Sequence, residues 1–476
     1  SNSPINDIIT PLVDWQFYTS GSDSLTLSAI TSKFLWIHGP DDGNVKTVIL
    51  SGALNAESLK LGWVSNTGSG VLTLADGTTN TIGSITDGSP LNSDNAITFG
   101  GTTTITNAFD TSNIKTINSS GIIIVPSVTI DSTGTNNTTW TLDEDTTISG
   151  DFTIQETLGT TTIDTNGNTL SVGGSVLFDS ADDPTITEMN LTMTGSGETL
   201  TWNDYTNRIS TLTLATGSSI TLTGTVRYDA ISGDGDLNLG GKAFVSGNPV
   251  SDFWTYTGDI TGAGTVSLTI RNSISNTEDI NTGAATTSII STADTLTLNN
   301  LFTTGELFIG TSTIVTGLTV NGNLTCDALT IGTSGNTGSG ILTLASGTTN
   351  TIGSIVAGDP LNSGNELNFG ASRVLTSGIF DGDNIAITSN EAFIFDGTVV
   401  NVDNAGSPAI KAINSVDGLN NTNVIFPAET FDTPVLMLTK YGQIIQKPIS
   451  ALDRLRLVKL PKYGSHPNPL NYQIRK

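Results

Sequence analysis

The sequence predicts an all-β protein with an elongated, β-solenoid-like body, and three observations support this fold class. Apolar residues make up 36% of the 476 residues and charged residues 13%, while Thr, Ser, Gly and Asn fill most of the remainder. Short apolar alternations are separated by turn residues at roughly 8- to 12-residue intervals. A long segment also occurs twice in the chain. Disordered chains are richer in charged residues than this sequence, and helical proteins are richer in Ala, Leu, Glu and Lys.

The alternating segments consist of residues that favour strands. Thr102 to Ile105 and Thr160 to Ile163 are β-branched throughout. Their stiff χ1 angles suit a pleated surface and are unfavourable in a helix. In Leu170-Ser171-Val172, the apolar side chains alternate with a polar one, so they would lie on one face of a half-buried strand.

The duplicated segment is the clearest feature of the sequence. Residues 66–100 recur as residues 336–370, with 26 of 35 positions identical at an offset of 270. A weaker match continues on both sides, where Gly52 aligns with Gly322 and, after a one-residue slip, Phe109 aligns with Phe380. Such internal repetition is typical of architectures in which similar units stack on one another.

A shorter pattern predicts the corners between strands. Residues 231–239 (ISGDGDLNL) and residues 260–268 (ITGAGTVSL) each join a glycine-rich turn to an alternating strand. Glycine permits the positive φ angles that a tight corner requires. Because the spacing from Ile231 to Ile260 is close to the length of one solenoid coil, we expect the two segments to be equivalent corners of a three-sided solenoid.

Together with residues 318–325 (LTVNGNLT), these segments resemble the repeats of bacterial autotransporter passengers and of phage tail-fibre shafts. The resemblance implies a right-handed β-helical or fibrous β architecture. It also implies an extracellular, cell-surface or virion-surface location and a role in adhesion or surface structure.

Composition divides the chain into five regions. We expect residues 1–50 to form an aromatic-rich N-terminal cap with a small core of its own. Residues 51–131 and 322–430 hold the two copies of the duplicated module, and residues 132–321 form the central Thr/Gly/Asn-rich body. Residues 431–476 form a C-terminal extension. Tandem β-sandwiches are the alternative fold, because strands at this spacing also build sandwiches.

Charge separates the C-terminal extension from the body. The chain has a net charge of −26 and a pI near 4.1, which excludes nucleic acid as a partner for most of its surface. The extension holds eight basic and two acidic residues, whereas the first 430 residues hold 10 basic and 42 acidic ones. We therefore expect the extension to dock on acidic surface of its own or a neighbouring subunit. Its basic residues are Lys440, Lys447, Arg454, Arg456, Lys459, Lys462, Arg475 and Lys476.

The sequence offers little material for catalysis, and we expect no enzymatic activity. The two histidines, His38 and His466, are expected to be surface residues, and the single cysteine, Cys326, a small buried side chain. Acidic residues cluster mostly beside Gly, Asn or Thr, where aspartate hydrogen-bonds turn backbone. A polysaccharide-degrading tailspike would use such a carboxylate pair. The clusters are Asp143-Glu144-Asp145, Asp182-Asp183, Asp234 with Asp236, and Asp381 with Asp383.

Ligand sites are weakly indicated. Asp234 and Asp236 lie in half of a calcium-binding nonapeptide pattern, so calcium is the one cofactor that the sequence suggests. Aromatic residues on a solenoid can stack on sugars, but packing in the core is the commoner role. The central aromatic residues are Trp140, Trp202, Trp254 and Tyr256. No run of 18 or more apolar residues is present, so no transmembrane helix is expected.

We therefore expect a structural protein that assembles with copies of itself into an extracellular or virion filament, sheath, surface layer or fibre. The alternative is an adhesin that recognises glycans or a host receptor. Asn-x-Ser/Thr sequences would permit glycosylation outside the cell, although they are also expected by chance in this composition. They occur at Asn118, Asn136, Asn137, Asn190, Asn323 and Asn420.

Overall fold

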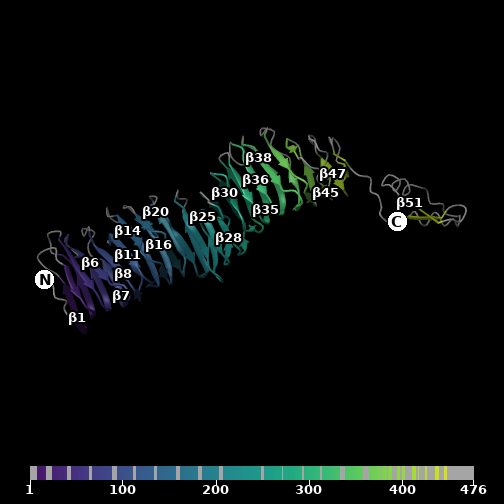
Figure 1. Cartoon of the computed structure of the whole chain (residues 1–476). Helices are drawn as coiled ribbons and strands as arrows, with labels where there is room; N and C mark the ends of the chain where they lie inside the picture. Colours follow the sequence, from purple (N-terminus) through teal and green to yellow (C-terminus); the bar gives the residue numbers. More distant parts are fainter. Residues whose placement is uncertain are drawn as a thin grey trace.

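The computed structural model is an all-β rod, with no helix among the residues that it describes (Figure 1). The described residues are 8–17, 24–39, 44–63, 67–87, 94–110, 114–132, 137–156, 161–180, 185–202, 207–247, 251–270, 272–291, 294–310, 314–332, 338–356, 364–376, 378–382 and 384–388, together with seven short strands between 394 and 447. None of the described segments is a helix long and apolar enough to cross a membrane.

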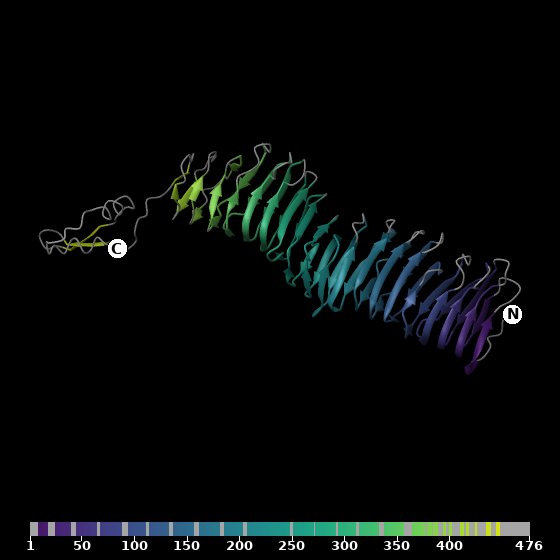
Figure 2. The ribbon, with the colours of Figure 1, turned by 180° about the vertical axis from the view of Figure 1, so that it is seen from behind.

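Parallel pairing between segments about one coil apart defines a β-solenoid. Ile30 pairs with Leu54, and Ile220 pairs with Leu237. Each circuit of the chain therefore stacks on the previous one, and its strands continue the same ladders. This confirms the predicted solenoid and excludes the sandwich alternative, whose sheets are antiparallel. Figures 1 and 2 show the strands stacked across the long axis of the rod.

The coils form two sheets in the N-terminal part of the rod and a third that begins soon after. Sheet I contains β1 (Ile8–Phe17), β3 (Ile30–Ile37), β5 (Leu54–Leu61), β7 (Thr79–Asp87), β9 (Thr102–Ile105) and β12 (Ile123–Ile124). Sheet II contains β2 (Ser24–Leu27), β4 (Val45–Leu50), β6 (Ser69–Leu74), β8 (Ala96–Gly100), β11 (Thr116–Ser120), β14 (Thr138–Leu142), β17 (Thr161–Asp164) and β20 (Thr185–Thr187). Sheet III contains β10 (Phe109–Asp110), β13 (Ser127–Ser132), β16 (Asp151–Glu156), β19 (Val176–Ser180), β22 (Ser196–Trp202), β24 (Ser219–Leu222), β26 (Asp236–Asn238) and β29 (Ile260–Thr261).

Two further sheets continue the solenoid, and a hairpin follows it. Sheet IV contains β15 (Thr146–Ile148), β18 (Thr169–Val172), β21 (Asn190–Met193), β23 (Ile209–Leu214), β25 (Val226–Gly233), β27 (Ala243–Ser246), β28 (Trp254–Tyr256), β30 (Thr265–Ile270), β32 (Ile280–Asn281), β33 (Thr286–Ser291), β35 (Phe302–Ile309), β37 (Leu324–Ile331), β39 (Thr349–Ile352), β40 (Ile355–Val356), β42 (Arg373–Leu375), β43 (Ile379–Asp381), β45 (Ile394–Asp396), β46 (Val399–Asn401), β47 (Ile410–Ile413), β48 (Val416–Asp417) and β49 (Val424–Ile425). Sheet V contains β31 (Ile274–Asn276), β34 (Thr295–Leu298), β36 (Thr316–Val320), β38 (Gly340–Leu344), β41 (Glu366–Asn368) and β44 (Ala386–Thr388). The hairpin pairs β50 (Val435–Leu438) with β51 (Ile444–Lys447) in antiparallel fashion.

The core is a column of apolar side chains in register from coil to coil. Along sheet II, Val48, Leu72, Ile97, Ile117 and Trp140 pair in sequence, and each is buried. The residues between them face outward because successive side chains of a strand point to opposite faces. The apolar residues of the alternating segments therefore point into the core, and the polar residues between them point to the surface.

The central part of the rod has short coils and an aromatic core. The rings of Phe178 and Trp202 lie 4.3 Å apart, and those of Tyr228 and Phe244 stack at 4.0 Å. All four are fully buried. Trp140, Trp254 and Tyr256 are also at most 2% exposed, so the expected core role of the central aromatic residues is confirmed.

The two glycine-rich motifs do not occupy equivalent corners, and that prediction is wrong. Ile231 lies in sheet IV and pairs with Trp254, whereas Ile260 lies in sheet III and pairs with Leu237. The reason is that the coil is shorter here than the spacing of the two motifs. The glycine requirement itself holds, since Gly233 has a φ of 93° and a Cβ there would lie 1.9 Å from a backbone oxygen.

The first 50 residues, expected to be a cap with its own core, form coils continuous with the body. β1 pairs with β3, and β3 pairs with β5. Trp15 and Phe17 are partly buried and pack against the same continuous core. The described part of this region therefore belongs to the same column.

The duplication extends further in the structure than in the sequence. The register of β5 on β3 is repeated by β37 on β35, although only three of the eight aligned residues in 30–37 and 302–309 are identical. A buried asparagine also recurs. Asn80 Oδ1 accepts a hydrogen bond from the backbone N–H of Leu54 (2.9 Å), and Asn350 Oδ1 accepts one from Leu324 (2.8 Å).

We expect Asn350→Ala to lower the free energy of unfolding by about 1–3 kcal/mol, because it leaves the buried N–H of Leu324 without its acceptor. The matched control is Thr351→Ala at the exposed neighbouring position, with an expected change under about 0.5 kcal/mol. Urea unfolding of both variants measures the difference, and equal stability of the two would contradict the role of the asparagine.

Candidate contact surfaces

The largest aromatic cluster outside the core lies on the outward face of sheet I. The rings of Trp36 and Trp63 stack with centroids 4.4 Å apart, and Lys60 Nζ lies 4.8 Å from the Trp36 ring. Trp36 Nε1 donates to the carbonyl oxygen of Gly62 at 2.7 Å. Both tryptophans are only partly buried. Two aromatic rings and a cation on one surface are suited to binding a partner.

His38 packs against this aromatic cluster. The sequence predicted a surface position for His38, and that prediction is wrong. Its side chain is 3% exposed, and its ring lies 4.3 Å from that of Trp63. Nδ1 lies 2.8 Å from the carbonyl oxygen of Gly39, and Nε2 lies 2.5 Å from Gln16 Nε2. A donor at Nδ1 and an acceptor at Nε2 satisfy both contacts. His466 lies outside the described residues.

The aromatic cluster is not repeated on the equivalent strands beside the second copy of the duplicated module. There, Phe308 occupies the position of Trp36, and its partner across the ladder is Thr330 where the first copy has Lys60. The cores of the two copies match, but this part of the surface does not. The sequence led to no prediction for Trp63. Phe34 and Trp36 alternate with buried residues, and this pattern could have indicated aromatic side chains on the outward face.

The N-terminal end of the rod presents strand edges. β1 and β2 are the terminal strands of sheets I and II. Among the described residues, β1 pairs on one side only, with β3. A bulge lies between Thr10 and Asp14, and Pro11 within it has no N–H to donate. The bulge and the proline interrupt the regular row of backbone donors along the first half of β1, and within the described part of the chain β2 pairs only with β4.

The eight basic side chains between Lys440 and Lys476 lie outside the described residues, although Lys447 belongs to strand β51. The backbone of β50 and β51 forms a two-stranded sheet of its own. Docking of the tail therefore stays a prediction.

Two described carboxylates, Asp145 and Asp151, accept hydrogen bonds from backbone N–H groups of the next coil. Asp145 Oδ1 accepts from the backbone N–H of Thr169 (2.8 Å), and Asp151 Oδ1 accepts from that of Ser175 (2.8 Å). Each bond therefore stabilises the stacking of one coil on the next. Asp182, Asp183 and Asp383 lie outside the described residues, and Asp381 lies in β43.

The calcium candidates sit beside a buried tyrosine. Asp234 Oδ1 accepts from Thr216 Oγ1 (2.7 Å), and Asp236 begins β26. Burial, followed by the charges of Asp236 and Asp259, raises the pKa of the Tyr256 hydroxyl, which donates to the carbonyl oxygen of Gly235. The described residues contain no group of three or more His, Cys, Asp or Glu placed to hold a metal.

Cys326 is buried in β37, at 3% exposure. Burial, with a smaller contribution from Asp327, raises the pKa of its thiol to about 12. At pH 8 the thiolate fraction is then roughly 1,000-fold lower than for an exposed cysteine. We expect a thiol reagent to label Cys326 rapidly in the unfolded chain. In the folded chain the labelling rate should be at least ~100-fold lower, because the thiolate fraction is lower. Equal labelling rates would contradict the buried position.

No protein-family model matches this chain, and searches of curated proteins and of solved structures find no significant match. The function proposed for the chain therefore rests on its geometry.

Proposed function

We propose that this chain is a structural subunit of an extracellular or virion assembly and that it polymerises with copies of itself into a filament, sheath, surface layer or fibre. The observation that carries the proposal is the stack of parallel strands, in which β1 and β2 are terminal strands of sheets I and II and, among the described residues, each pairs on one side only. Pairing at such an edge gives affinity through backbone hydrogen bonds and requires no catalytic side chain.

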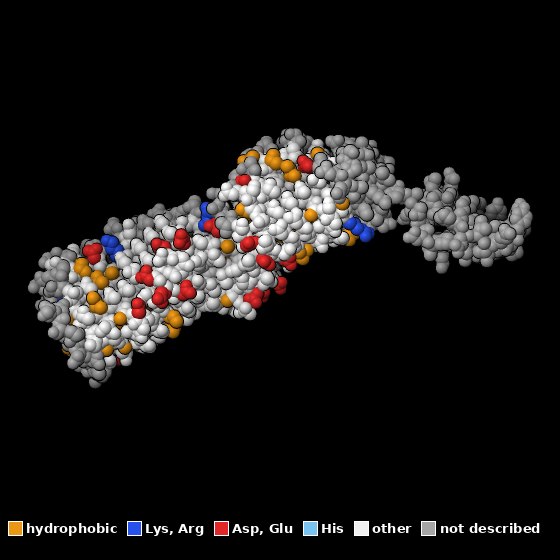
Figure 3. All heavy atoms as spheres, viewed as in Figure 1, with side chains coloured by type: hydrophobic (Ala, Val, Ile, Leu, Met, Phe, Trp, Pro, Cys, Tyr) orange, Lys and Arg blue, Asp and Glu red, His pale blue; other side chains and the backbone are white. Residues whose placement is uncertain are grey.

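The surface supports the same proposal. Figure 3 shows that backbone and side chains that are neither hydrophobic nor charged cover most of the visible face of the described rod, with acidic residues scattered among them. A basic extension of net charge +6 in the sequence complements this acidic body. We propose that the extension of one subunit binds the body of the next and brings the strand edges together.

Removal of residues 431–476 tests the proposal. We expect the full chain to form polymers that sediment rapidly, and the truncated chain to remain a folded β-rich monomer by circular dichroism. A second variant, Arg454→Glu with Arg456→Glu, reverses two positive charges of the extension and keeps the test informative if truncation perturbs folding. Polymers that persist in both variants, or a full chain that stays monomeric at high concentration, would reject the proposal.

A second candidate function is adhesion to glycans or a receptor, and the aromatic cluster at Trp36 and Trp63 favours it. Stacked tryptophans next to a lysine are groups that can bind sugar rings and their hydroxyls. A glycan array with the wild-type chain and with Trp36→Ala tests this. Binding that Trp36→Ala abolishes while polymers persist would support adhesion as the function.

A further inference from the structure

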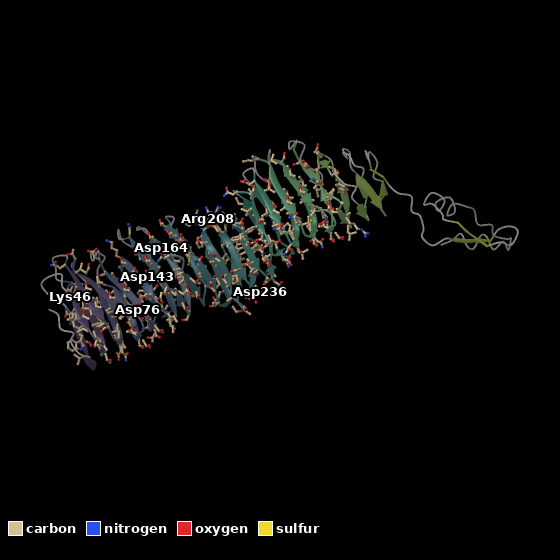
Figure 4. The ribbon with its side chains drawn as sticks, viewed as in Figure 1. Lys46, Asp76, Asp143, Asp164, Arg208 and Asp236 are labelled. Atoms are coloured by element: carbon tan, nitrogen blue, oxygen red, sulfur yellow. The ribbon has the colours of Figure 1, made fainter. Side chains whose placement is uncertain are left out.

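Two arginines of the acidic body are neighbours at sheet IV. The first 430 residues hold only 10 basic residues, and the assembly proposed above uses none of them. Ile209 of β23 pairs with Tyr228 of β25, and both side chains are fully buried. Arg208 and Arg227 each come one residue earlier, so they are neighbours across the pairing and lie on the outward face. Figure 4 shows Arg208 at the edge of the rod, near its middle.

Arg208 already binds a carboxylate of the chain. Its Nη1 lies 3.2 Å from Asp229 Oδ1, and the two side chains are 29% and 28% exposed. Arg208 also lies against the backbone at Gly247, where a Cβ would come within 2.8 Å of Arg208 Cδ. The guanidinium is therefore held by an ion pair and by a close backbone contact.

Arg227 has the same chemistry without such a partner. It is partly buried, and it makes no ion pair or hydrogen bond with another residue that the structure describes. Its Nε is shielded from water and unpaired, which is unfavourable for a charged donor. The strand beneath is rigid, because Tyr228 stacks on Phe244 in the core with ring centroids 4.0 Å apart. Arg227 is thus a well-anchored guanidinium whose donors are unused.

The cluster of three charged residues lacks one negative charge. Arg208 and Arg227 contribute two positive charges, and Asp229 contributes one negative charge. One further carboxylate would balance the cluster, as Asp229 does for Arg208. A guanidinium can bind a carboxylate through two parallel N–H···O bonds, which are stronger than neutral hydrogen bonds. Because the whole chain has a net charge of −26, a ligand with a single negative charge is favoured over a polyanion.

We propose that Arg227, together with Arg208, binds the carboxylate of a singly charged acidic sugar such as a uronic acid. Side chains that are neither hydrophobic nor charged cover much of the described rod in Figure 3, and their hydroxyl and amide groups can hydrogen-bond the hydroxyls of a sugar. The site is separate from the aromatic cluster at Trp36 and Trp63 and does not depend on polymerisation, so either function proposed above can fail without it.

Ligand-observed NMR titrations of the full chain test the site with three small probes. Glucuronate carries a carboxylate and sugar hydroxyls, glucose lacks the carboxylate, and acetate lacks the sugar. We expect saturable binding of glucuronate and no binding of glucose. Acetate should bind at least ~10-fold more weakly than glucuronate, a factor that one or two hydrogen bonds from the sugar hydroxyls supply.

Substitutions of Arg227 locate the binding. Arg227→Gln should weaken glucuronate binding at least ~10-fold, because the charge-assisted bonds are lost. Arg227→Lys keeps the charge without the planar fork and should have an intermediate affinity. The matched control is Lys115→Gln, which removes a charge from the exposed ion pair with Asp94 and should change the affinity less than ~2-fold. Circular dichroism establishes folding, and Arg227→Lys carries the comparison if Arg227→Gln does not fold.

Four results would overturn the proposal. The first is a wild-type chain that shows no saturable binding of glucuronate, and the second is an equal loss in the Arg227 variants and Lys115→Gln. The third is equal affinity for acetate and glucuronate, which would remove the sugar from the assignment. The fourth concerns Asp204, four residues before Arg208 in the sequence: binding that appears only in Asp204→Asn would mean that a carboxylate of the chain itself occupies Arg227.

Discussion

Trp254→Ala should destabilise the rod by about 3–5 kcal/mol, the cost typical of emptying a large aromatic position in a core. Trp254 is fully buried in the aromatic centre of the rod, edge-on to Tyr256 with ring centroids 6.1 Å apart. Its backbone N–H is bound by Asn276 Oδ1 at 3.0 Å, a bond that the substitution leaves in place. The loss therefore measures packing of the side chain.

Trp36→Ala is the matched control for this prediction. Trp36 is only partly buried, on the outward face of sheet I, so the same truncation should cost less than half as much, about 1–2 kcal/mol. Urea unfolding, monitored by circular dichroism, compares the two variants. A larger loss for Trp36→Ala than for Trp254→Ala would mean that the column of inward residues is not the main source of stability.

A chain without residues 66–335 should still fold, although it lacks more than half of the sequence. The deletion joins the first copy of the duplicated module to the second at the same point of the coil, so β5 would be followed by β38. Leu59 pairs with Ile85 in the first copy, and Leu329 pairs with Ile355 in the second. In the shortened chain Leu59 would meet Ile355, an equivalent contact.

Small-angle scattering measures the outcome of this deletion. We expect a rod of unchanged cross-section that is shorter by about 60 Å, from roughly 12 coils at ~4.8 Å each. A deletion of residues 66–323 is the control, because it joins the copies out of phase and places outward residues in the core. An unfolded product from the in-phase deletion, or equal folding of both, would contradict stacking of interchangeable coils.

Much of the fold could be predicted from local pattern. Strict alternation in segments such as Leu170-Ser171-Val172 separates inward from outward side chains, and the structure has Leu170 and Val172 in the core. The repeat at an offset of 270 predicted stacked, similar units. These features are visible in sequence because the period of a strand is short and the core is a continuous column.

Features that depend on the length of each coil could not be predicted. The motifs at Ile231 and Ile260 look alike but lie on different sheets, since nothing local states how many residues complete a circuit. His38 was expected on the surface, yet it is buried beside Trp63, which lies on the next coil.

Electron microscopy of the full chain under assembly conditions tests the central claim most directly, namely that the parallel strand stacking of the solenoid continues between subunits. The account predicts unbranched filaments with the width of a single rod and rungs about 4.8 Å apart that continue through the subunit junctions. Beaded or globular particles, or rods that remain single at every concentration, would contradict it.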